Sequence, residues 1–335
     1  MPTVLQLRPE ADPAAVNAAL QGLGVHGEVA RGAGGAVIVL GPVSCVVAPG
    51  VLADLPGVAA VLAGPSPHPR LDALAWRAVR VGPGDLAIGP GAPPVLIAGP
   101  CAAESRAQVD AAAALAAAAG AKLLRGGAYK PRTSPYAFDG AGPDGLGWLR
   151  DAADRHGLGL VTEALSEADV ERVAAVADLI QIGSRQMQAF ALLRAVGRTG
   201  RPVLLKRGRA ATLAEWRLAA EHLLAAGAPG VVFCERGIAG ADPELRNTFD
   251  LAGAVLLRCS MGLPVIADPS HAAGRRDVIA PLARAAWAAG LDGVVVEAHA
   301  DARHALSDGV QALSPAELAA LGRALGTARA QEEER

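Results

Sequence analysis

The chain has 335 residues, a hydrophobic fraction of 52% and a formal net charge of −2 at pH 7. This length predicts one large domain with a smaller one beside it. The near-neutral charge argues against a chain-wide basic surface for nucleic acid or anionic membranes, so any basic site must be a local concentration. Aromatic residues make up only 3% of the chain, and we expect a core of small aliphatic side chains.

The cysteines and the N-terminal residues indicate the compartment. None of the four cysteines forms a C-x-x-C pair, which is typical of a reducing compartment. Residues 1–11 lack a basic segment followed by a long apolar run, so we expect no signal peptide. No uncharged apolar run reaches about 18 residues, the length needed to span a membrane. These features predict a soluble, cytoplasmic protein.

Residues 1–75 predict a small ferredoxin-like α+β domain. Its expected strands cover residues 4–8, 34–41 and 58–64. A helix over 12–24 begins with Asp12 as N-cap and ends at Gly24. A second helix is short, over about 50–55, and the order approaches β-α-β-β-α-β. Residues 76–92 follow as a linker and a β-hairpin around Pro83-Gly84-Asp85.

From residue 93 to 328 the pattern becomes regular. Apolar segments predict strands at 95–100, 122–127, 159–164, 179–184, 202–208, 231–237, 264–270 and 293–299. Ala- and Leu-rich stretches such as 107–120 and 212–227 predict helices between them. Eight alternating repeats fit the (β/α)₈ TIM barrel. A doubly wound sheet is the alternative, but no G-x-G-x-x-G follows the first strand.

Polar residues gather at the predicted C-terminal strand ends, where barrel enzymes place their sites. The ends of strands seven, eight and one are neighbours in a closed barrel. They carry one thiol, one imidazole and two carboxyls, from Cys101, His271, Glu297 and Asp308. Each alone is more often a core or structural residue. Together they predict a site for a divalent first-row transition metal.

A second group at these strand ends is cationic. It comprises Arg125, Lys130, Arg132, Arg185, Lys206 and Arg236. Glu163 and Glu235 can neutralise some of these charges, but the remaining buried cations require anions, namely phosphate or carboxylate groups of substrates. The loop that carries Lys130 and Arg132 also offers Thr133 and Ser134.

With these residues in view, the chain resembles the 3-deoxy-D-arabino-heptulosonate 7-phosphate (DAHP) synthases, of the type with an N-terminal ferredoxin-like domain. The resemblance covers about residues 79–325. It is carried by the segments GPCAAES (99–105), LRGGAYKPRTSPYAF (124–138), QIGSRQMQAF (181–190), PVLLKRG (202–208), CERG (234–237), RNTFDL (246–251), DPSHAAGRR (268–276) and EAHADARHALSDGVQAL (297–313).

The resemblance implies the condensation of phosphoenolpyruvate with erythrose 4-phosphate that opens the shikimate route to aromatic amino acids. It implies that the four metal-site residues are ligands, with Mn²⁺ as first choice and Fe²⁺, Co²⁺ or Zn²⁺ as alternatives. The implied phosphoenolpyruvate residues are Arg125, Lys130, Arg185, Lys206 and Arg236. The implied erythrose 4-phosphate residues are Arg132, Thr133, Ser134 and Asp268.

Further expectations follow from the same resemblance. Lys130, Glu163 and His271 are candidates for moving protons, and the sequence does not choose among them. The family forms homodimers or homotetramers, and its N-terminal domain can bind an aromatic amino acid, so tyrosine or phenylalanine is the expected feedback inhibitor. No nucleic-acid or membrane partner is expected.

Two other functions remain as alternatives. The 3-deoxy-D-manno-octulosonate 8-phosphate synthases share the fold and phosphoenolpyruvate but use a five-carbon sugar phosphate. They typically carry a different loop where this chain has KPRTS, and their metal-free forms replace the cysteine found here as Cys101. A catalytically silent amino-acid sensor on the same barrel is the other alternative, and loss of a metal ligand would indicate it.

Overall fold

The computed structural model describes residues 3–32, 35–41, 44–82, 84, 86–132 and 134–333. The chain divides into two compact units, residues 1–69 and 70–335. Among the described residues, no helix is both long and apolar enough to cross a membrane.

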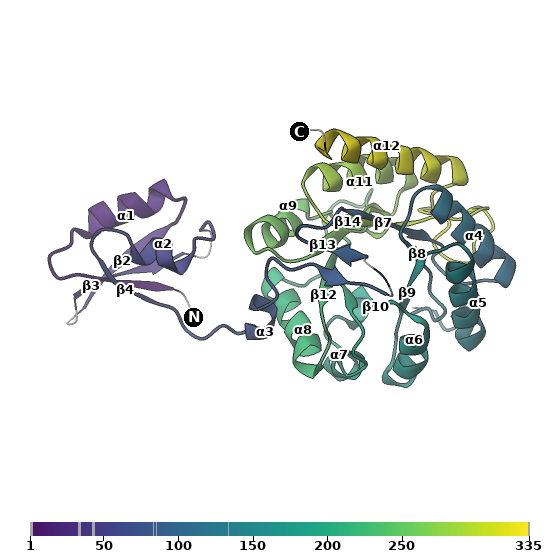
Figure 1. Cartoon of the computed structure of the whole chain (residues 1–335), viewed down its shortest axis with the longest axis horizontal. Coiled ribbons are helices and arrows are strands. Elements are labelled where there is room, and N and C mark those ends of the chain that lie inside the picture. The colour runs from purple at the N-terminus through teal and green to yellow at the C-terminus, as the bar shows by residue number, and fades with distance from the viewer. Residues whose placement is uncertain are drawn as a thin grey trace. The chain divides into compact units, whose positions relative to one another are not determined.

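The first unit is a four-stranded antiparallel sheet with two helices (Figure 1). Its elements are β1 (Val4–Leu7), α1 (Pro13–Gly22), β2 (Gly27–Gly32), β3 (Gly35–Leu40), α2 (Pro49–Ala53) and β4 (Val58–Leu62). The strand order β2-β3-β1-β4 is compatible with the predicted ferredoxin-like domain. Asp12 caps α1 as expected, because its carboxylate accepts a hydrogen bond from the Ala14 amide.

The sequence analysis did not predict strand β2. Its residues read GEVARG, and all but the first are exposed. It lies at the edge of the sheet, where it pairs with β3 alone. Without a buried face the strand shows no alternation of apolar and polar residues, which is the signal that strand prediction uses.

The second unit is a closed barrel of eight parallel strands, which confirms the predicted TIM barrel (Figure 1). The strands are β7 (Val95–Gly99), β8 (Leu123–Arg125), β9 (Gly159–Glu163), β10 (Leu179–Ile182), β11 (Val203–Lys206), β12 (Val231–Glu235), β13 (Val265–Ala267) and β14 (Gly293–Glu297). Strand β14 pairs with β7 from Gly293–Val95 to Glu297–Gly99, and this pairing closes the barrel.

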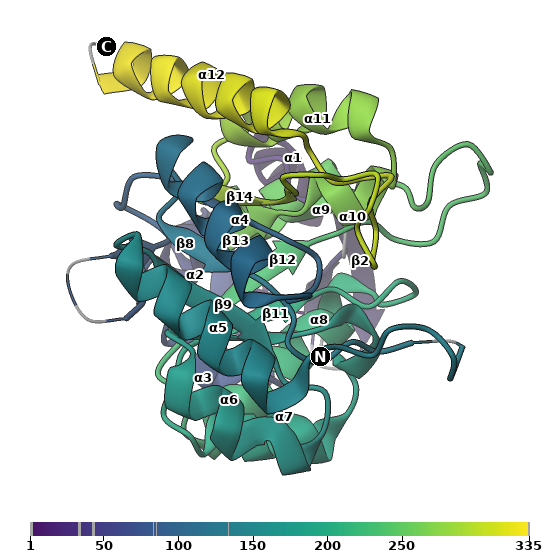
Figure 2. The same cartoon turned by 90° about the vertical axis from the view of Figure 1, so that its right-hand side faces the viewer.

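Helices surround the barrel on its outside. They are α4 (Arg106–Ala118), α5 (Gly142–Arg155), α6 (Val170–Val176), α7 (Phe190–Gly197), α8 (Leu213–Ala226), α9 (Leu251–Val255), α11 (Ile279–Ala288) and α12 (Pro315–Glu333). The short helix α10 (Pro269–Ala273) follows β13 directly. Helix α12 packs beside both α11 and α4 and so joins the two ends of the helical ring (Figure 2).

Two apolar layers form the core of the barrel unit. One fills the barrel interior with side chains such as Ile97, Leu123 and Leu204, and the other lies between the strands and the helices. The hairpin strands β5 (Val79–Arg80) and β6 (Ala87–Ile88) add Val79 and Ile88 to the interior layer. The hairpin is therefore present as predicted, although Pro83 and Asp85 at its turn lie outside the described residues.

The short helix α3 (Pro69–Asp72) packs on the barrel, within the stretch that the sequence analysis gave to the first domain. The Glu221 carboxylate on α8 accepts hydrogen bonds from the amides of Arg70 and Leu71. The Leu71 side chain is buried in the layer between strands and helices. These contacts place residues 70–75 with the barrel unit.

Candidate active site

A cavity of about 290 Å³ lies where the C-terminal ends of the barrel strands meet. All six predicted cations border it: Arg125, Lys130, Arg132, Arg185, Lys206 and Arg236. Glu163, His271 and Asp308 border it as well. Residues from the ends of seven strands, β8 to β14, or from the loops that follow them, therefore face one volume, as expected for parallel strands whose ends lie on one rim.

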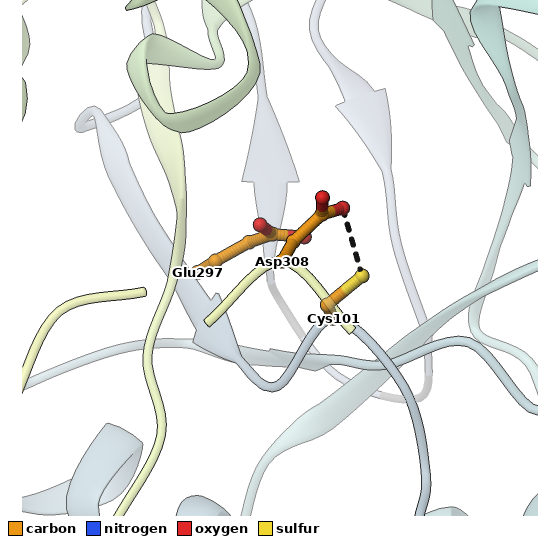
Figure 3. A group of neighbouring side chains, drawn as sticks. All are labelled: Cys101, Glu297 and Asp308. Carbon is orange, nitrogen blue, oxygen red and sulfur yellow. Dashed lines mark hydrogen bonds between the residues drawn. The ribbon is translucent and has the colours of Figure 1, made fainter. Parts of the chain in front are cut away.

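Cys101, Glu297 and Asp308 form a compact cluster beside this cavity (Figure 3). The Cys101 Sγ, one carboxylate oxygen of Glu297 and one of Asp308 all lie within 4.8 Å of one another. Cys101 follows β7, Glu297 ends β14 and Asp308 lies in the loop after it. Asp308 has a φ of +52°, an uncommon value for a residue with a side chain, and such values gather at functional sites.

Gly99 allows the chain to deliver Cys101 to this place. A Cβ at Gly99 would lie 2.1 Å from the Arg125 carbonyl oxygen, so a side chain would force β7 and β8 apart. The cysteine two residues later is almost fully buried, at 3% exposure. Its Sγ lies 3.0 Å from the Ser307 Oγ and 3.2 Å from an Asp308 carboxylate oxygen.

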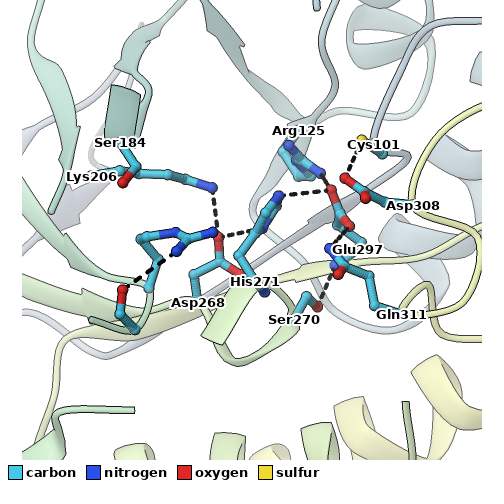
Figure 4. Close-up of polar contacts among 12 residues, drawn as sticks. Cys101, Arg125, Ser184, Lys206, Asp268, Ser270, His271, Glu297, Asp308 and Gln311 are labelled. Atoms are coloured by element: carbon cyan, nitrogen blue, oxygen red, sulfur yellow. Dashed lines mark hydrogen bonds and ion pairs between the residues drawn. The ribbon is translucent and has the colours of Figure 1, made fainter. Parts of the chain in front are cut away.

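His271 stands beside this cluster rather than inside it (Figure 4). Its Nε2 lies 3.4 Å from a Glu297 oxygen, and its Nδ1 lies 2.8 Å from Asp268 Oδ2. A carboxylate on one ring nitrogen, with the other directed at a ligand set, is the usual environment of a metal-binding histidine. Sulfur, nitrogen and oxygen donors are thus available together, and this donor set fits a divalent transition metal.

Burial and neighbouring charges shift the pKa values of the cluster in opposite directions. Burial, reinforced by the Glu297 charge, raises the pKa of the Cys101 thiol to about 12. Burial also tends to raise the pKa of Glu297, but His271 and Arg125 outweigh it and lower that pKa to about 2. Burial lowers the pKa of His271 as well. At neutral pH the cluster therefore holds a carboxylate, a neutral imidazole and a protonated thiol.

The cations of the cavity differ in how their charge is compensated. Arg125 pairs with Glu297 at 2.5 Å, and Lys206 pairs with Asp268 at 2.5 Å. Arg236 is only 5% exposed, yet no carboxylate among the described residues lies within ion-pair distance of its guanidinium. Burial lowers the pKa of Arg236. Arg236 Nη1 donates only a long hydrogen bond to the Gly237 carbonyl, at 3.4 Å. A buried cation without a carboxylate partner favours an anionic ligand.

Arg207 and Glu235 form a separate ion pair, and neither residue is among those that border the cavity. Arg207 Nη1 lies 3.1 Å from Glu235 and 2.7 Å from Asp250. Its guanidinium also stacks on Trp216, 5.6 Å from the ring centroid. Glu235 therefore compensates the charge of Arg207. Glu163 instead accepts a hydrogen bond from the Gln181 side-chain amide at the cavity wall.

The residues expected to bind erythrose 4-phosphate do not all border the cavity. Arg132 borders the cavity, and its Nε donates to the Phe138 carbonyl. Ser134 is exposed and accepts from the Tyr136 amide, away from the residues that border the cavity. Asp268 is buried beneath Lys206 and His271. Thr133 lies outside the described residues.

The sequence analysis missed several polar residues at this site. Arg209 and Arg246 border the cavity, and Gln311 donates a hydrogen bond to Glu297. Arg209 comes directly after the predicted strand 202–208, and Arg246 lies well beyond the predicted strand 231–237, in a loop whose path the sequence does not reveal. Gln311 carries no charge, and only its position three residues after Asp308 could have suggested a role.

Residues 72–332 match the DAHP synthetase I family. The chain belongs to this family. The match covers the barrel and begins after the end of the first unit. It agrees with the segments that carried the resemblance in the sequence, all of which lie within these residues.

The chain is similar both to individual DAHP synthases and, at lower identity, to 2-dehydro-3-deoxyphosphooctonate aldolases. The phospho-2-dehydro-3-deoxyheptonate aldolase of Thermotoga maritima is 48% identical over 230 residues, which are 69% of this chain and 68% of that one. The crystal structure of the Thermotoga maritima DAHP synthase superposes with a TM-score of 0.74 at 36% identity, covering 97% of this chain and 96% of that one. A 2-dehydro-3-deoxyphosphooctonate aldolase of Rhodopseudomonas palustris is 34% identical, over 68% of this chain and 85% of the relative.

Proposed function

We propose that this protein is a DAHP synthase. It condenses phosphoenolpyruvate with erythrose 4-phosphate and water, and it releases DAHP and inorganic phosphate. The observation that carries the proposal is the juxtaposition at the barrel mouth of a cation-lined cavity and a cluster of sulfur, nitrogen and oxygen donors, in a chain of the DAHP synthetase I family.

Cys101, His271, Glu297 and Asp308 would hold the divalent metal ion on which this family depends. When bound there, the ion supplies a Lewis acid for the aldehyde of erythrose 4-phosphate. Mn²⁺ is our first choice, and Fe²⁺, Co²⁺ and Zn²⁺ suit the same donors. The lowered pKa of Glu297 keeps one ligand ionised at every physiological pH.

The cations of the cavity bind the two anionic substrates. Arg236 is buried and has no carboxylate partner among the residues that the structure describes, so it is the strongest candidate for the phosphate of phosphoenolpyruvate. Arg125, Lys130, Arg185 and Lys206 complete that subsite, and Arg132 with its loop neighbours holds erythrose 4-phosphate. Their fixed charges offset negative charge as C3 of phosphoenolpyruvate attacks the aldehyde, water adds at C2 and the C–O bond to phosphate breaks.

Proton movement falls to residues at the cavity wall. His271 faces Asp268 on one ring nitrogen and the donor cluster on the other, so neither nitrogen is free for this task. Lys130 and Glu163 both border the cavity. Lys130 Nζ donates to the Cys101 carbonyl at 2.9 Å, which keeps the ammonium close to the donor cluster. We assign proton transfer to Lys130 and Glu163.

The first unit is the proposed regulatory part. Tyrosine or phenylalanine binding there would inhibit the barrel, in a cytoplasmic homodimer or homotetramer. The family resemblance supports this assignment, together with the compatible sheet order of the unit.

A second candidate is the octulosonate reaction, because 2-dehydro-3-deoxyphosphooctonate aldolases are relatives at about one-third identity. The test supplies Mn²⁺-loaded enzyme and phosphoenolpyruvate with either erythrose 4-phosphate or arabinose 5-phosphate, and follows phosphate release. DAHP synthase requires turnover with the four-carbon sugar and little with the five-carbon sugar. The reverse preference would assign the octulosonate reaction, and no turnover with either would favour the sensor.

A further inference from the structure

Arg246 and Asn247 are adjacent residues in the loop between β12 and α9. Their contacts lead to three of the four donor residues, namely His271, Glu297 and Asp308. The backbone amides of Arg246 and Asn247 donate to the carbonyls of Ala273 and Ala272, both at 2.9 Å. These carbonyls belong to helix α10, which carries His271. The Asn247 side chain, 2% exposed, also donates to the His271 carbonyl at 2.8 Å.

The Arg246 side chain lies near Asp308 and is linked to Glu297 through Gln311. Its Nη1 donates to Gln311 Oε1 at 2.9 Å and lies 3.5 Å from an Asp308 oxygen. Gln311 is 1% exposed, and its Nε2 donates to Glu297 Oε2 at 2.5 Å (Figure 4). The backbone N–H of Gln311 donates to the backbone carbonyl of Asp308 at 3.1 Å.

The chemistry of these contacts allows one arrangement only. A guanidinium can only donate hydrogen bonds and a carboxylate can only accept them. The Gln311 amide therefore has to present its oxygen to Arg246 and its nitrogen to Glu297. Arg246, Gln311 and Glu297 form a directed series, which occupies one oxygen of Glu297 and leaves the other toward Arg125 and His271.

Gly274 provides the room for Arg246. It has a φ of +68°, and a Cβ built there would lie 2.6 Å from the Arg246 Cβ. Helix α10 ends at this residue, so the arginine passes directly over the end of the helix that carries His271.

We propose that Arg246, Asn247 and Gln311 are positioning residues that hold His271, Glu297 and Asp308 in the arrangement that binds the metal ion. The inference rests on the proposed metal site. Because Arg246 also borders the substrate cavity, its side chain joins the ligand set to the anion-binding wall.

The direction in which Arg246→Met changes the affinity for the metal ion distinguishes a positioning role from simple electrostatics. Arg246 is a cation near a cation site, so Coulomb repulsion alone predicts that Arg246→Met binds metal more tightly. Loss of positioning predicts weaker binding, by about 10- to 100-fold for partners of metal ligands. Methionine keeps most of the side-chain length and removes the hydrogen bonds.

The experiment measures the Mn²⁺ dissociation constant from the electron paramagnetic resonance signal of the free ion. Wild type, Arg246→Met, Gln311→Met and the double variant are compared. Two controls match the changes: Arg132→Met removes a cation from the same cavity, and Gln181→Met removes a buried glutamine that serves Glu163 instead. Thermal unfolding of each metal-free variant verifies folding.

We expect both single variants to bind Mn²⁺ at least about tenfold more weakly, with both controls within about twofold of wild type. The double variant should bind about as weakly as the weaker single variant, because residues acting in series are not additive. Unchanged or tighter binding by folded Arg246→Met would overturn the inference, as would losses that add in the double variant. If wild type itself binds no Mn²⁺ dependent on Cys101, the proposed metal site fails first.

Discussion

At the scale of single residues, Arg207 and Arg236 show that two buried arginines on adjacent strand ends can have unrelated roles. Arg207 lies between Glu235 and Asp250 and over Trp216. Arg236 has no such carboxylate among the described residues and borders the cavity. The charge of Arg207 is thus compensated by neighbouring carboxylates, whereas no carboxylate of the described residues compensates the charge of Arg236.

The two arginines should therefore respond oppositely to the same change. Arg236→Gln should raise the KM for phosphoenolpyruvate about 10- to 100-fold, the value of a charge-assisted hydrogen bond. Its thermal stability should stay level or rise, since an uncompensated buried charge is removed. Arg207→Gln should cost about 3–5 kcal/mol of stability, because Glu235 is left buried and unpaired. Steady-state kinetics and denaturant unfolding of both variants decide this, and a destabilised Arg236→Gln with normal KM would refute the assignment.

The pKa of the Cys101 thiol leads to a prediction about how Mn²⁺ binding depends on pH. Its pKa of about 12 means that the thiol is protonated at pH 7. Coordination requires the thiolate, so Mn²⁺ binding should release about one proton and weaken as pH falls. Burial lowers the pKa of His271, so the imidazole is already neutral and contributes no proton near pH 7.5. Calorimetry in buffers of different ionisation enthalpy measures the release. A value near zero for wild type would contradict the role of the thiol.

At the scale of elements, the loop after β14 carries Ser307 and Asp308 to the site. The Glu104 side chain contacts this loop and holds it in place. One Glu104 oxygen accepts from the Leu306 amide at 2.8 Å, and the other lies 3.6 Å from His299 Nε2. Glu104 itself follows Cys101 by three residues. Glu104 thus links the segment after Cys101 to the loop that carries Asp308, through contacts that do not involve the donor side chains.

Glu104→Ala should loosen this loop. We expect amide hydrogen exchange at residues 304–308 to accelerate about tenfold or more, as for loss of a hydrogen bond of about 1.5 kcal/mol. Glu104→Gln retains an oxygen acceptor for the Leu306 amide and should restore most of the protection. Exchange that is equally slow in all three proteins would show that other contacts hold the loop.

The elements also show how far prediction from sequence reached. The barrel strands were predictable because each is a short apolar run at a regular interval. The polar residues at their ends, with Asp308 in the loop beyond the last strand, suggested Cys101, His271, Glu297 and Asp308 as a metal site. The exposed edge strand β2 was not predictable, because it has no buried face. Gln311 and Arg246 were missed because their importance comes from contacts between loops distant in sequence. The roles of the predicted site residues stay predictions.

At the scale of the whole molecule, the chain consists of two compact units, and residues 70–75 belong with the second. The Glu221 carboxylate and the buried Leu71 side chain tie this stretch to the barrel.

Two truncated chains test the boundary. Residues 66–335 should fold and retain turnover without inhibition by tyrosine or phenylalanine. Residues 76–335 should melt several degrees lower, because losing Leu71 alone removes about 1.5–3 kcal/mol of apolar burial. Each kcal/mol corresponds to about 2–4 °C for a chain of this size. Equal melting temperatures would place residues 66–75 outside the cooperative unit.

The most direct test of the central claim is phosphate release from phosphoenolpyruvate and erythrose 4-phosphate, measured before and after Mn²⁺ is returned to metal-stripped protein. Wild type should be inactive when stripped and active when restored. Cys101→Ser should stay at least about 100-fold below wild type, in line with loss of a metal ligand. Cys259→Ser, at an exposed cysteine, should match wild type. Full turnover by stripped wild type, or by Cys101→Ser, would contradict the metal-centred account of this site.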